Sequence, residues 1–335
     1  MENTVEQFGL VKHVVNKGGS IHPLIIPSEV TLGTGLMNPS IYNDNGRLLI
    51  NIRHVNYTLY HSEKKQFQHQ FGPLQYLHPE HDRTLTTVNY LCTLTNDLTL
   101  DKIHRVDTSK LDVKPIWEFI GLEDARLFRW NEKLYLCGVR RDTTTNGVGR
   151  MELSEIELTD TYAKEISRVR IPAPGNDATY CEKNWMPVLD QPYHFVKWSN
   201  PTEVVQVDPV AKTCITSTLD QTKYIPLPAD LRGGSQVIPW GEYHLSLTHE
   251  VALYNSELGR KDGRYRHRFI VWDKNWTIVK VSPVFSFMTG EIEFCCGATF
   301  HNGNLLVSFG FQDNSAFILR IPENILVNFI DNWED

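Results

Sequence analysis

E-D-A-R-L-F-R-W-N-E-K-L-Y-L-C-G-V-R-R, from Glu123 to Arg141, has the pattern of a β-hairpin. Polar residues open a short apolar run, a turn follows, and a second apolar run ends on polar residues. Runs rich in β-branched and aromatic residues, separated by turn residues, are typical of antiparallel strands. The same pattern recurs in four other stretches, Asn38–Arg53, Lys183–Trp198, Gly233–Glu250 and Cys296–Asp313.

The spacing of these hairpins indicates a repeat architecture. Their opening positions are Asn38, Asp124, Asn184, Ser235 and Gly297. They recur at intervals of roughly 50 to 90 residues, which suits four-stranded propeller blades with insertions in some of them. Helical periodicity is scarce along the chain. We therefore expect an all-β fold, a five-bladed β-propeller that forms a single domain over residues 1–335, with an insertion at residues 55–114 after the hairpin of the first blade.

The polar ends of the hairpins predict a site. In an antiparallel hairpin the start of the first strand and the end of the second lie at the same end. If the hairpins are the inner strands of the blades, their polar ends meet around one mouth of the propeller axis. These ends are Asn38, Ser40, Arg53, Glu123, Asp124, Arg126, Arg140, Arg141, Lys183, Asn184, Lys197, Arg232, His249, Glu250 and Asp313. Cations facing carboxylates suit an anion or an array of sugar hydroxyls. The alternative is that these ends are polar only because they face water.

Composition restricts the partners. The net charge of −7 argues against nucleic acid, which is bound by basic surfaces. No apolar run reaches transmembrane length, and the start of the chain does not have the pattern of a secretory signal. We expect a cytoplasmic protein with reduced cysteines that does not bind a membrane, and small-molecule or neutral polymer substrates fit the composition better than nucleic acid. A homo-oligomer remains open. The stretch L-H-P-E-H-D, from Leu77 to Asp82, is interpreted as a solvated loop, so no metal site is predicted.

The segment G-L-E-D-A-R-L-F, from Gly121 to Phe128, resembles the G-x-E-D-P-R signature of glycoside hydrolase family 130. This family contains β-mannoside phosphorylases and mannosidases built on a five-bladed propeller. Further segments resemble the family in the same order: N-P-S-I followed by Arg53, E-K-N-W-M-P, R-G-G-S, L-T-H-E, I-E-F-C-C-G and G-F-Q-D. Ala125 departs from the family pattern, because it stands where the family usually has a proline that fixes φ after the acid.

The resemblance implies a mechanism and a set of site residues. Asp124 corresponds to the general acid, which protonates the leaving oxygen through a hydroxyl of the mannosyl unit while a nucleophile inverts the anomeric carbon. The resemblance implies a small oligosaccharide or a sugar phosphate as the substrate. Inorganic phosphate is the implied co-substrate, with no other cofactor. Asn38, Arg53 and Asp313 resemble the sugar-binding residues, and Ser40, Glu123 and Asn184 at the same mouth are predicted to bind substrate with them. Arg141, Lys183 and His249 are the implied phosphate-binding cations.

The acid role adds an electrostatic expectation. A general acid must carry a proton at the working pH, so the pKa of Asp124 is expected to be raised. The neighbouring Glu123 and partial desolvation would supply that shift, whereas pairing with Arg126 would oppose it.

Alternative functions remain open from the sequence. Mannosyl transfer from GDP-mannose, by a β-1,2-mannosyltransferase, would need more cations than one phosphate requires, and Arg140, Arg141, Arg150 and Lys197 are candidates. A β-mannoside hydrolase would use glutamates as the base. A glycan-binding propeller without catalysis would not depend on Asp124.

Overall fold

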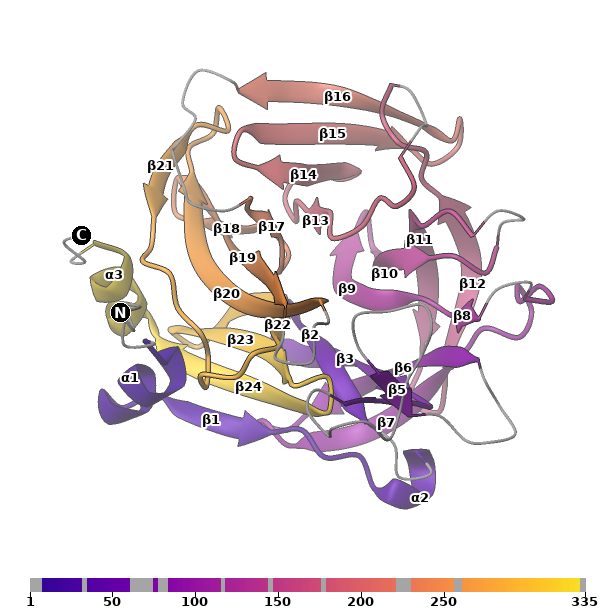
Figure 1. Ribbon diagram of the computed structural model, residues 1–335, viewed down its shortest axis with the longest axis horizontal. Coiled ribbons are helices and arrows are strands. Elements are labelled where there is room, and N and C mark those ends of the chain that lie inside the picture. The colour runs from indigo at the N-terminus through magenta and orange to yellow at the C-terminus, as the bar shows by residue number, and fades with distance from the viewer. Residues whose placement is uncertain are drawn as a thin grey trace.

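The computed structural model describes residues 8–31, 35–60, 75–77, 84–115, 118–143, 147–175, 179–220, 230–255 and 261–331. Antiparallel sheets surround a central axis like the blades of a propeller (Figure 1). The described strands form five blades, four with four strands and one with five, which confirms the predicted all-β, five-bladed fold.

The first two blades are joined at their outer edges. Blade 1 consists of β2 (Leu36–Asp44), β3 (Arg47–Val55), β6 (Leu85–Leu94) and β7 (Leu100–Asp107). Blade 2 consists of β9 (Glu123–Trp130), β10 (Lys133–Arg140), β11 (Arg150–Leu158) and β12 (Ala163–Arg170). A short parallel pairing between β7 and β12 links them, and β8 (Phe119–Ile120) pairs in parallel with β6.

The other three blades complete the ring. Blade 3 consists of β13 (Met186–Pro187), β14 (His194–Ser199), β15 (Thr202–Asp208) and β16 (Thr213–Asp220). In blade 4, the two short strands β17 (Arg232–Gly233) and β18 (Ile238–Trp240) both pair with β19 (Tyr243–Asn255), which is followed by β20 (Lys261–Trp272) and β21 (Ile278–Val281). Blade 5 consists of β22 (Glu293–His301), β23 (Asn304–Phe311) and β24 (Ser315–Pro322), with β1 (Ser20–Pro23) as its outer strand.

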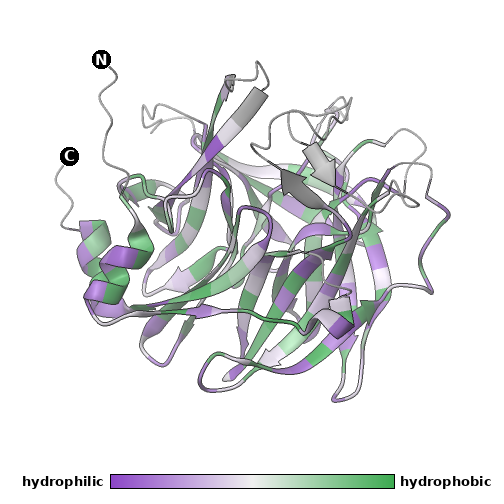
Figure 2. Cartoon of the chain, turned by 60° about the horizontal axis from the view of Figure 1, so that its bottom comes forward, coloured by the Kyte–Doolittle hydropathy of each residue, from purple (hydrophilic) through white to green (hydrophobic). Residues whose placement is uncertain are grey.

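Both ends of the chain therefore belong to the last blade. β1 pairs antiparallel with β24, so the N-terminal strand closes the ring. Helix α1 (Leu10–Asn16) lies beside α3 (Glu323–Asp331) in Figures 1 and 2, and Phe8 stacks on Phe329 with ring centroids 5.5 Å apart. The third helix among the described residues is α2 (Ser28–Thr31). None of the described helices has the length and apolar character needed to span a membrane.

The core lies between neighbouring blades. A hydrophobic cluster fills each of the five blade interfaces. Successive strand residues point to opposite faces, so Leu49 of β3 packs in one cluster with Leu127 of blade 2, whereas Ile50 packs with Ile318 of blade 5. Figure 2 shows this mixture of hydrophobic and hydrophilic residues along the strands. All six cysteines are free thiols.

The predicted insertion is shorter than expected. Within residues 55–114, strands β6 and β7 are the two outer strands of blade 1, so this part belongs to the blade itself. The added length before β6 includes the two-stranded ribbon of β4 (Thr58–Tyr60) and β5 (Gln75–Leu77). The residues of the L-H-P-E-H-D stretch from His78 to Asp82 lie outside the described residues.

Candidate active site

Four of the predicted site residues share an unusual backbone conformation. Asn38, Asp124, Asn184 and Asp313 have φ angles of 46°, 49°, 62° and 48°, in the left-handed region that asparagine and aspartate tolerate best. The register of β2 against β3 shifts between Met37 and Ser40, around Asn38. Bulges and left-handed residues concentrate at functional sites, where they aim a side chain away from the regular pleat.

Asp124 is the centre of a hydrogen-bonded group. Its Oδ1 accepts a bond of 2.8 Å from Nη1 of Arg53 and one of 2.7 Å from Nδ2 of Asn38. The other Arg53 terminal nitrogen, Nη2, lies 3.6 Å from Oε2 of Glu123. Residues from the first and second blades are thereby brought together, although Asn38 and Asp124 are far apart in the sequence.

Arg53 is fixed by two residues that the sequence patterns did not single out. Its Nη2 donates to the hydroxyl of Tyr57 at 2.9 Å, and its Nε donates to Oγ1 of Thr87 at 3.1 Å. Tyr57 and Thr87 lie outside the repeated hairpins, in the stretch interpreted as an insertion, so no repeat position marked them. Together with the ion pair to Glu123, these two bonds orient the guanidinium of Arg53 so that Nη1 faces Asp124.

Arg126 joins the remaining blades beneath Asp124. It is fully buried, and its Nη1 donates to the backbone oxygen of Asp124 at 2.7 Å, not to the carboxylate. Its Nε donates to the oxygen of Gly234 at 2.9 Å, and Nη2 lies 3.5 Å from Oδ1 of Asn184. Its guanidinium carbon stands 5.6 Å from the ring centroid of Phe294. Arg126 thus contacts blades 2, 3, 4 and the start of blade 5.

The electrostatics of Asp124 differ from the expectation. Burial pushes the pKa of Asp124 upward, but Arg53, the bond from Asn38, Arg126 and Lys183 outweigh it, so the pKa lies below its ordinary value. The prediction that its pKa is raised was therefore wrong for the ligand-free protein. Glu123 is not among the main causes of the shift; the strong partners are the cations and amide that folding gathers around the carboxylate.

Asp313 is the carboxyl group of this site whose pKa is raised. Burial, aided by the negative charge of Asp124, raises the pKa of Asp313 from 3.8 to about 6, although Arg53 and Lys183 oppose the shift. Two neighbouring carboxylates with pKa values moved in opposite directions give one ionised and one protonated group over a range of weakly acidic pH.

We expect Asp313→Asn to stabilise the protein above pH 6. A raised folded-state pKa means that the native protein binds this proton more tightly than the unfolded chain. Stability is thus lost as pH rises from about 4 through about 6. The variant has no such loss, so its free energy of unfolding at pH 7 should exceed that of the wild type by at most about 3 kcal/mol. Urea unfolding at pH 4, 5.5 and 7 measures this. Equal pH slopes for both proteins would contradict it.

Lys183 lies close enough to act electrostatically on Asp124, Asp313 and His249. Lys183 is exposed and forms no hydrogen bond or ion pair with any residue that the structure describes. His249 is buried, and its Nδ1 lies 3.0 Å from the backbone oxygen of Gly233. Burial, followed by the charges of His267, Arg232, Arg126 and Lys183, lowers the pKa of His249 well below its ordinary value.

His249 is therefore not the cation that the resemblance implied. A carbonyl oxygen only accepts, so Nδ1 must carry the proton of the neutral ring, and Nε2 is then an acceptor. Arg232 is a second exposed cation at this site. It lies opposite His249 in the antiparallel pairing of β17 with β19. Arg232 was seen in the sequence among the polar hairpin ends but was not assigned a role.

The other predicted cations have structural partners. Arg141 donates to the hydroxyl of Tyr180 at 3.1 Å and to Sγ of Cys181 at 3.4 Å. Arg140 is buried, with Nε 3.1 Å from Oε2 of Glu152. Lys197 lies between two carboxylates, and Arg150 donates to the oxygen of Gly149. Arg140 and Lys197 are therefore paired with carboxylates of the protein, and they do not add to the cations that a nucleotide sugar would need.

Ser40 belongs to the axis below the site. It is fully buried, its hydroxyl donates to the oxygen of Cys296 at 3.0 Å, and it accepts from the amide of Leu127 at 2.9 Å. Nε2 of the buried Gln236 donates to the oxygens of Leu127 and Ile41 at 2.6 and 3.1 Å, which links three blades across the axis. The substrate-binding role predicted for Ser40 is replaced by this structural one, because its hydrogen bonds are used within the protein.

The five blades and their order along the chain identify the fold class. The fold is the five-bladed propeller of glycoside hydrolase family 130. No family model matches the sequence, and no curated protein matches it at the sequence level.

Three solved structures illustrate this likeness. A β-1,2-mannobiose phosphorylase from Listeria innocua, in complex with β-1,2-mannobiose, has a TM-score of 0.51 and 14% identity, with 88% of this chain and 92% of that chain covered. A mannose phosphorylase from Leishmania mexicana, in complex with a phosphate ion, has a TM-score of 0.53 and 12% identity over 96% and 95%. A GDP-Man-dependent mannosyltransferase from Leishmania mexicana has a TM-score of 0.53 and 12% identity over 93% and 94%.

Proposed function

We propose that this protein is an inverting phosphorylase of β-mannosides, which forms or uses mannose 1-phosphate. The observation that carries the proposal is that Lys183, an exposed cation without a hydrogen bond or ion pair among the described residues, lies near enough to Asp124 for its charge to lower the pKa of that carboxylate. An acid for the leaving group and a cation for an anionic nucleophile are the two parts that phosphorolysis needs. The structures with the same fold include proteins described as mannoside phosphorylases, which supports the proposal.

The proposed reaction assigns a task to each group. The sugar binds against Asn38, Arg53 and Asp313, and phosphate binds against Lys183 and Arg232. An oxygen of phosphate attacks the anomeric carbon as the bond to the acceptor oxygen breaks, and the configuration at carbon inverts. The proton of Asp124 passes through a hydroxyl of the mannosyl unit to the departing oxygen. The products are mannose 1-phosphate and a free hydroxyl on the acceptor.

Phosphate binding also supports protonation of the acid. Lys183 is one of the charges that lower the pKa of both Asp124 and Asp313. A phosphate dianion beside Lys183 opposes that positive charge and raises the pKa of both carboxyls. In this proposal, the acid therefore gains its proton when the nucleophile is bound.

His249 contributes as a neutral group. With Nδ1 committed to the oxygen of Gly233, Nε2 accepts a hydrogen bond from the hydroxyl of hydrogen phosphate or from a sugar hydroxyl. The neutral ring adds no positive charge, so the cations Lys183 and Arg232 supply the attraction to the anion.

The direct test is to incubate the protein with mannose 1-phosphate and a series of sugar acceptors and to measure released phosphate. Phosphate release with one of the acceptors is the expected result. Release of GDP from GDP-mannose without activity on mannose 1-phosphate would instead assign a mannosyltransferase. Phosphate-independent cleavage of mannobiose would assign a hydrolase, and glycan binding without turnover would assign a binding propeller.

A further inference from the structure

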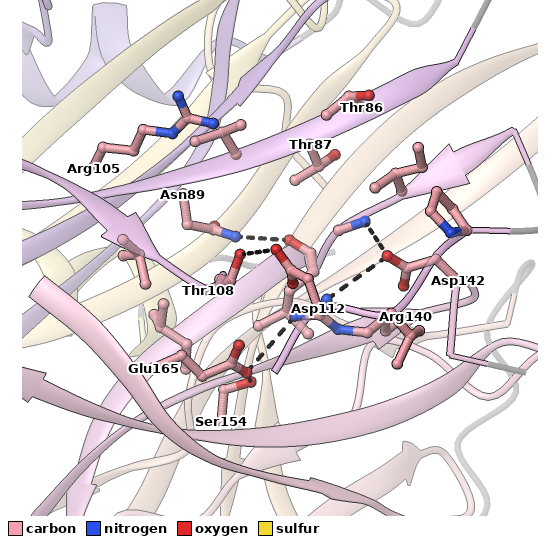
Figure 3. Close-up of a pocket in the computed structure, with 18 of the residues that line it drawn as sticks. Thr86, Thr87, Asn89, Arg105, Thr108, Asp112, Arg140, Asp142, Ser154 and Glu165 are labelled. Atoms are coloured by element: carbon pink, nitrogen blue, oxygen red, sulfur yellow. Dashed lines mark hydrogen bonds and ion pairs between the residues drawn. The ribbon is translucent and has the colours of Figure 1, made fainter. Parts of the chain in front are cut away.

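A cavity of about 210 Å³ lies between blades 1 and 2, behind the segment that carries Asp124 (Figure 3). Its walls include Thr87, Gly121, Arg140 and Asp142. Thr87 also accepts the bond from Nε of Arg53, so this cavity and the candidate active site share a wall.

Buried charges line one side of this cavity. Around Arg140, the carboxylates of Asp142, Glu152 and Glu165 lie 3.8, 3.1 and 3.8 Å away, and all four side chains are less than a tenth exposed. Burying charges costs several kcal/mol per ion even in good geometry, and a buried ion network is weak evidence for added stability. Its contacts with the neighbouring backbone indicate another role.

Asp142 holds the start of the acid-bearing segment. Its Oδ2 accepts a bond of 3.0 Å from the amide of Gly121 and faces Nη1 of Arg140, as Figure 3 shows. Gly121 has a φ of 96°, and a Cβ at this position would stand 2.2 Å from the backbone oxygen of Thr87. The backbone of Gly121 therefore packs closely against blade 1 on one side and donates a hydrogen bond to Asp142 on the other.

Buried amides hold the same segment on either side of Asp124. Nδ2 of Asn89 donates to the oxygen of Leu122 at 3.0 Å, and Nδ2 of Asn51 lies 3.4 Å from the oxygen of Ala125. Nδ2 of Asn51 also donates to Oδ1 of Asn89 at 2.9 Å. Asp124 keeps its left-handed backbone between these anchors, and Asp142 is the only charged one of the three.

We propose that Asp142, held by Arg140, is a positioning residue that sets the location of the Asp124 carboxyl through the amide of Gly121. The kinetic part of this inference rests on the proposed function. The pair acts behind the segment and touches neither sugar nor phosphate. Its loss displaces the acid relative to the leaving oxygen, and misplacement by about 1 Å costs about 10²-fold in rate.

The kinetic test compares three variants in the phosphate-release assay. We expect Asp142→Ala to lower kcat by about 10- to 100-fold while the KM for mannose 1-phosphate changes by less than about threefold. Asp142→Asn keeps a carbonyl oxygen for Gly121 and should recover kcat to within about fivefold of the wild type. Glu165→Gln is the matched control, since Glu165 is also buried and contacts Arg140 and Arg168, but its hydrogen bonds and ion pairs do not reach residues 121–125. Its kcat should stay within about threefold while its Tm falls.

Amide exchange tests the same inference without activity. The Gly121 amide should exchange slowly in the wild type, faster in Asp142→Ala and unchanged in Glu165→Gln, as read by mass spectrometry at single-residue resolution. Rapid exchange of Gly121 in the wild type would overturn the proposal even if Asp142→Ala does not fold. A folded Asp142→Ala with wild-type kcat, or an equal loss of kcat in Glu165→Gln, would also overturn it. An inactive wild type would instead reject the proposed function, and the exchange result would still stand.

Discussion

Replacement of Asp124 by asparagine is expected to lower the rate of mannosyl transfer by about 10³-fold, because asparagine has no acidic proton for the leaving oxygen. The side chain keeps its shape and its Oδ1, so Arg53 and Asn38 can still donate to it, and the KM for the donor should change little. Initial rates of phosphate release measure the effect. A 2,4-dinitrophenyl mannoside, whose leaving group needs no proton, should react with the variant at close to the wild-type rate.

The matched control is Asp44→Asn. Asp44 pairs with Arg129 at 2.6 Å, and its side chain is 15% exposed, against 18% for Asp124. It lies at the opposite end of strand β2 from the site. We expect its activity to remain within about twofold of the wild type. If Asp124→Asn kept a tenth or more of the activity on natural acceptors, Asp124 would not be the acid.

Replacement of Lys183 by methionine is expected to lower kcat/KM for phosphate by about 10- to 100-fold, since a hydrogen bond to a charged group contributes about 1.5–3 kcal/mol. Lys183 also lowers the pKa of Asp124 and Asp313. Its removal raises the pKa of both, so the acidic form persists to higher pH and the descending limb of the pH–rate profile moves to higher pH. Phosphate-dependent kinetics between pH 5 and 8 measure both effects.

Lys133→Met serves as the control for Lys183. Lys133 is exposed and pairs with Glu155 at 3.0 Å. It lies next to the turn of the blade 2 hairpin. Its loss should leave the phosphate dependence and the pH profile unchanged. A wild-type phosphate dependence in Lys183→Met would remove this residue from the anion site.

The repeated hairpins allowed the architecture and much of the site to be predicted. Asn38, Asp124 and Asn184 were marked because each is a polar residue that opens the apolar run of a repeated hairpin, and the family resemblance favoured a site over ends that are polar only because they face water. The closure of the ring by β1 could not be predicted in the same way, since Ser20–Pro23 is a short strand with no turn partner nearby in the sequence. Its pairing with β24 depends on the ring already being assembled.

Contacts between blades account for most of what the sequence missed. Tyr57 and Thr87 orient Arg53, yet neither side chain lies in a repeated hairpin. Gln236 does lie in one, beside the opening Ser235, but nothing in the repeat marks it as the residue that crosses the axis. Which residues of different blades meet is set by packing at the blade interfaces, and local patterns carry no information about it. Asp142 went unnoticed for the same reason.

Charge states could not be read from the sequence either. The opposite shifts of Asp124 and Asp313, and the neutral ring of His249, result from the balance between burial and charges that come from separate blades. The sequence likewise showed Arg140 as one of many cations near the mouth, whereas folding pairs it with buried carboxylates. Counting charges along the chain thus overestimated the cations free to bind a ligand.

A crystal structure of the protein soaked with mannose and phosphate tests the central claim most directly. The account predicts phosphate within hydrogen-bond distance of Lys183, and mannose against Arg53 and Asp313 with one hydroxyl on the carboxyl of Asp124. Phosphate bound on a different surface, or mannose located away from Asp124 while Lys183 faces only solvent, would contradict it.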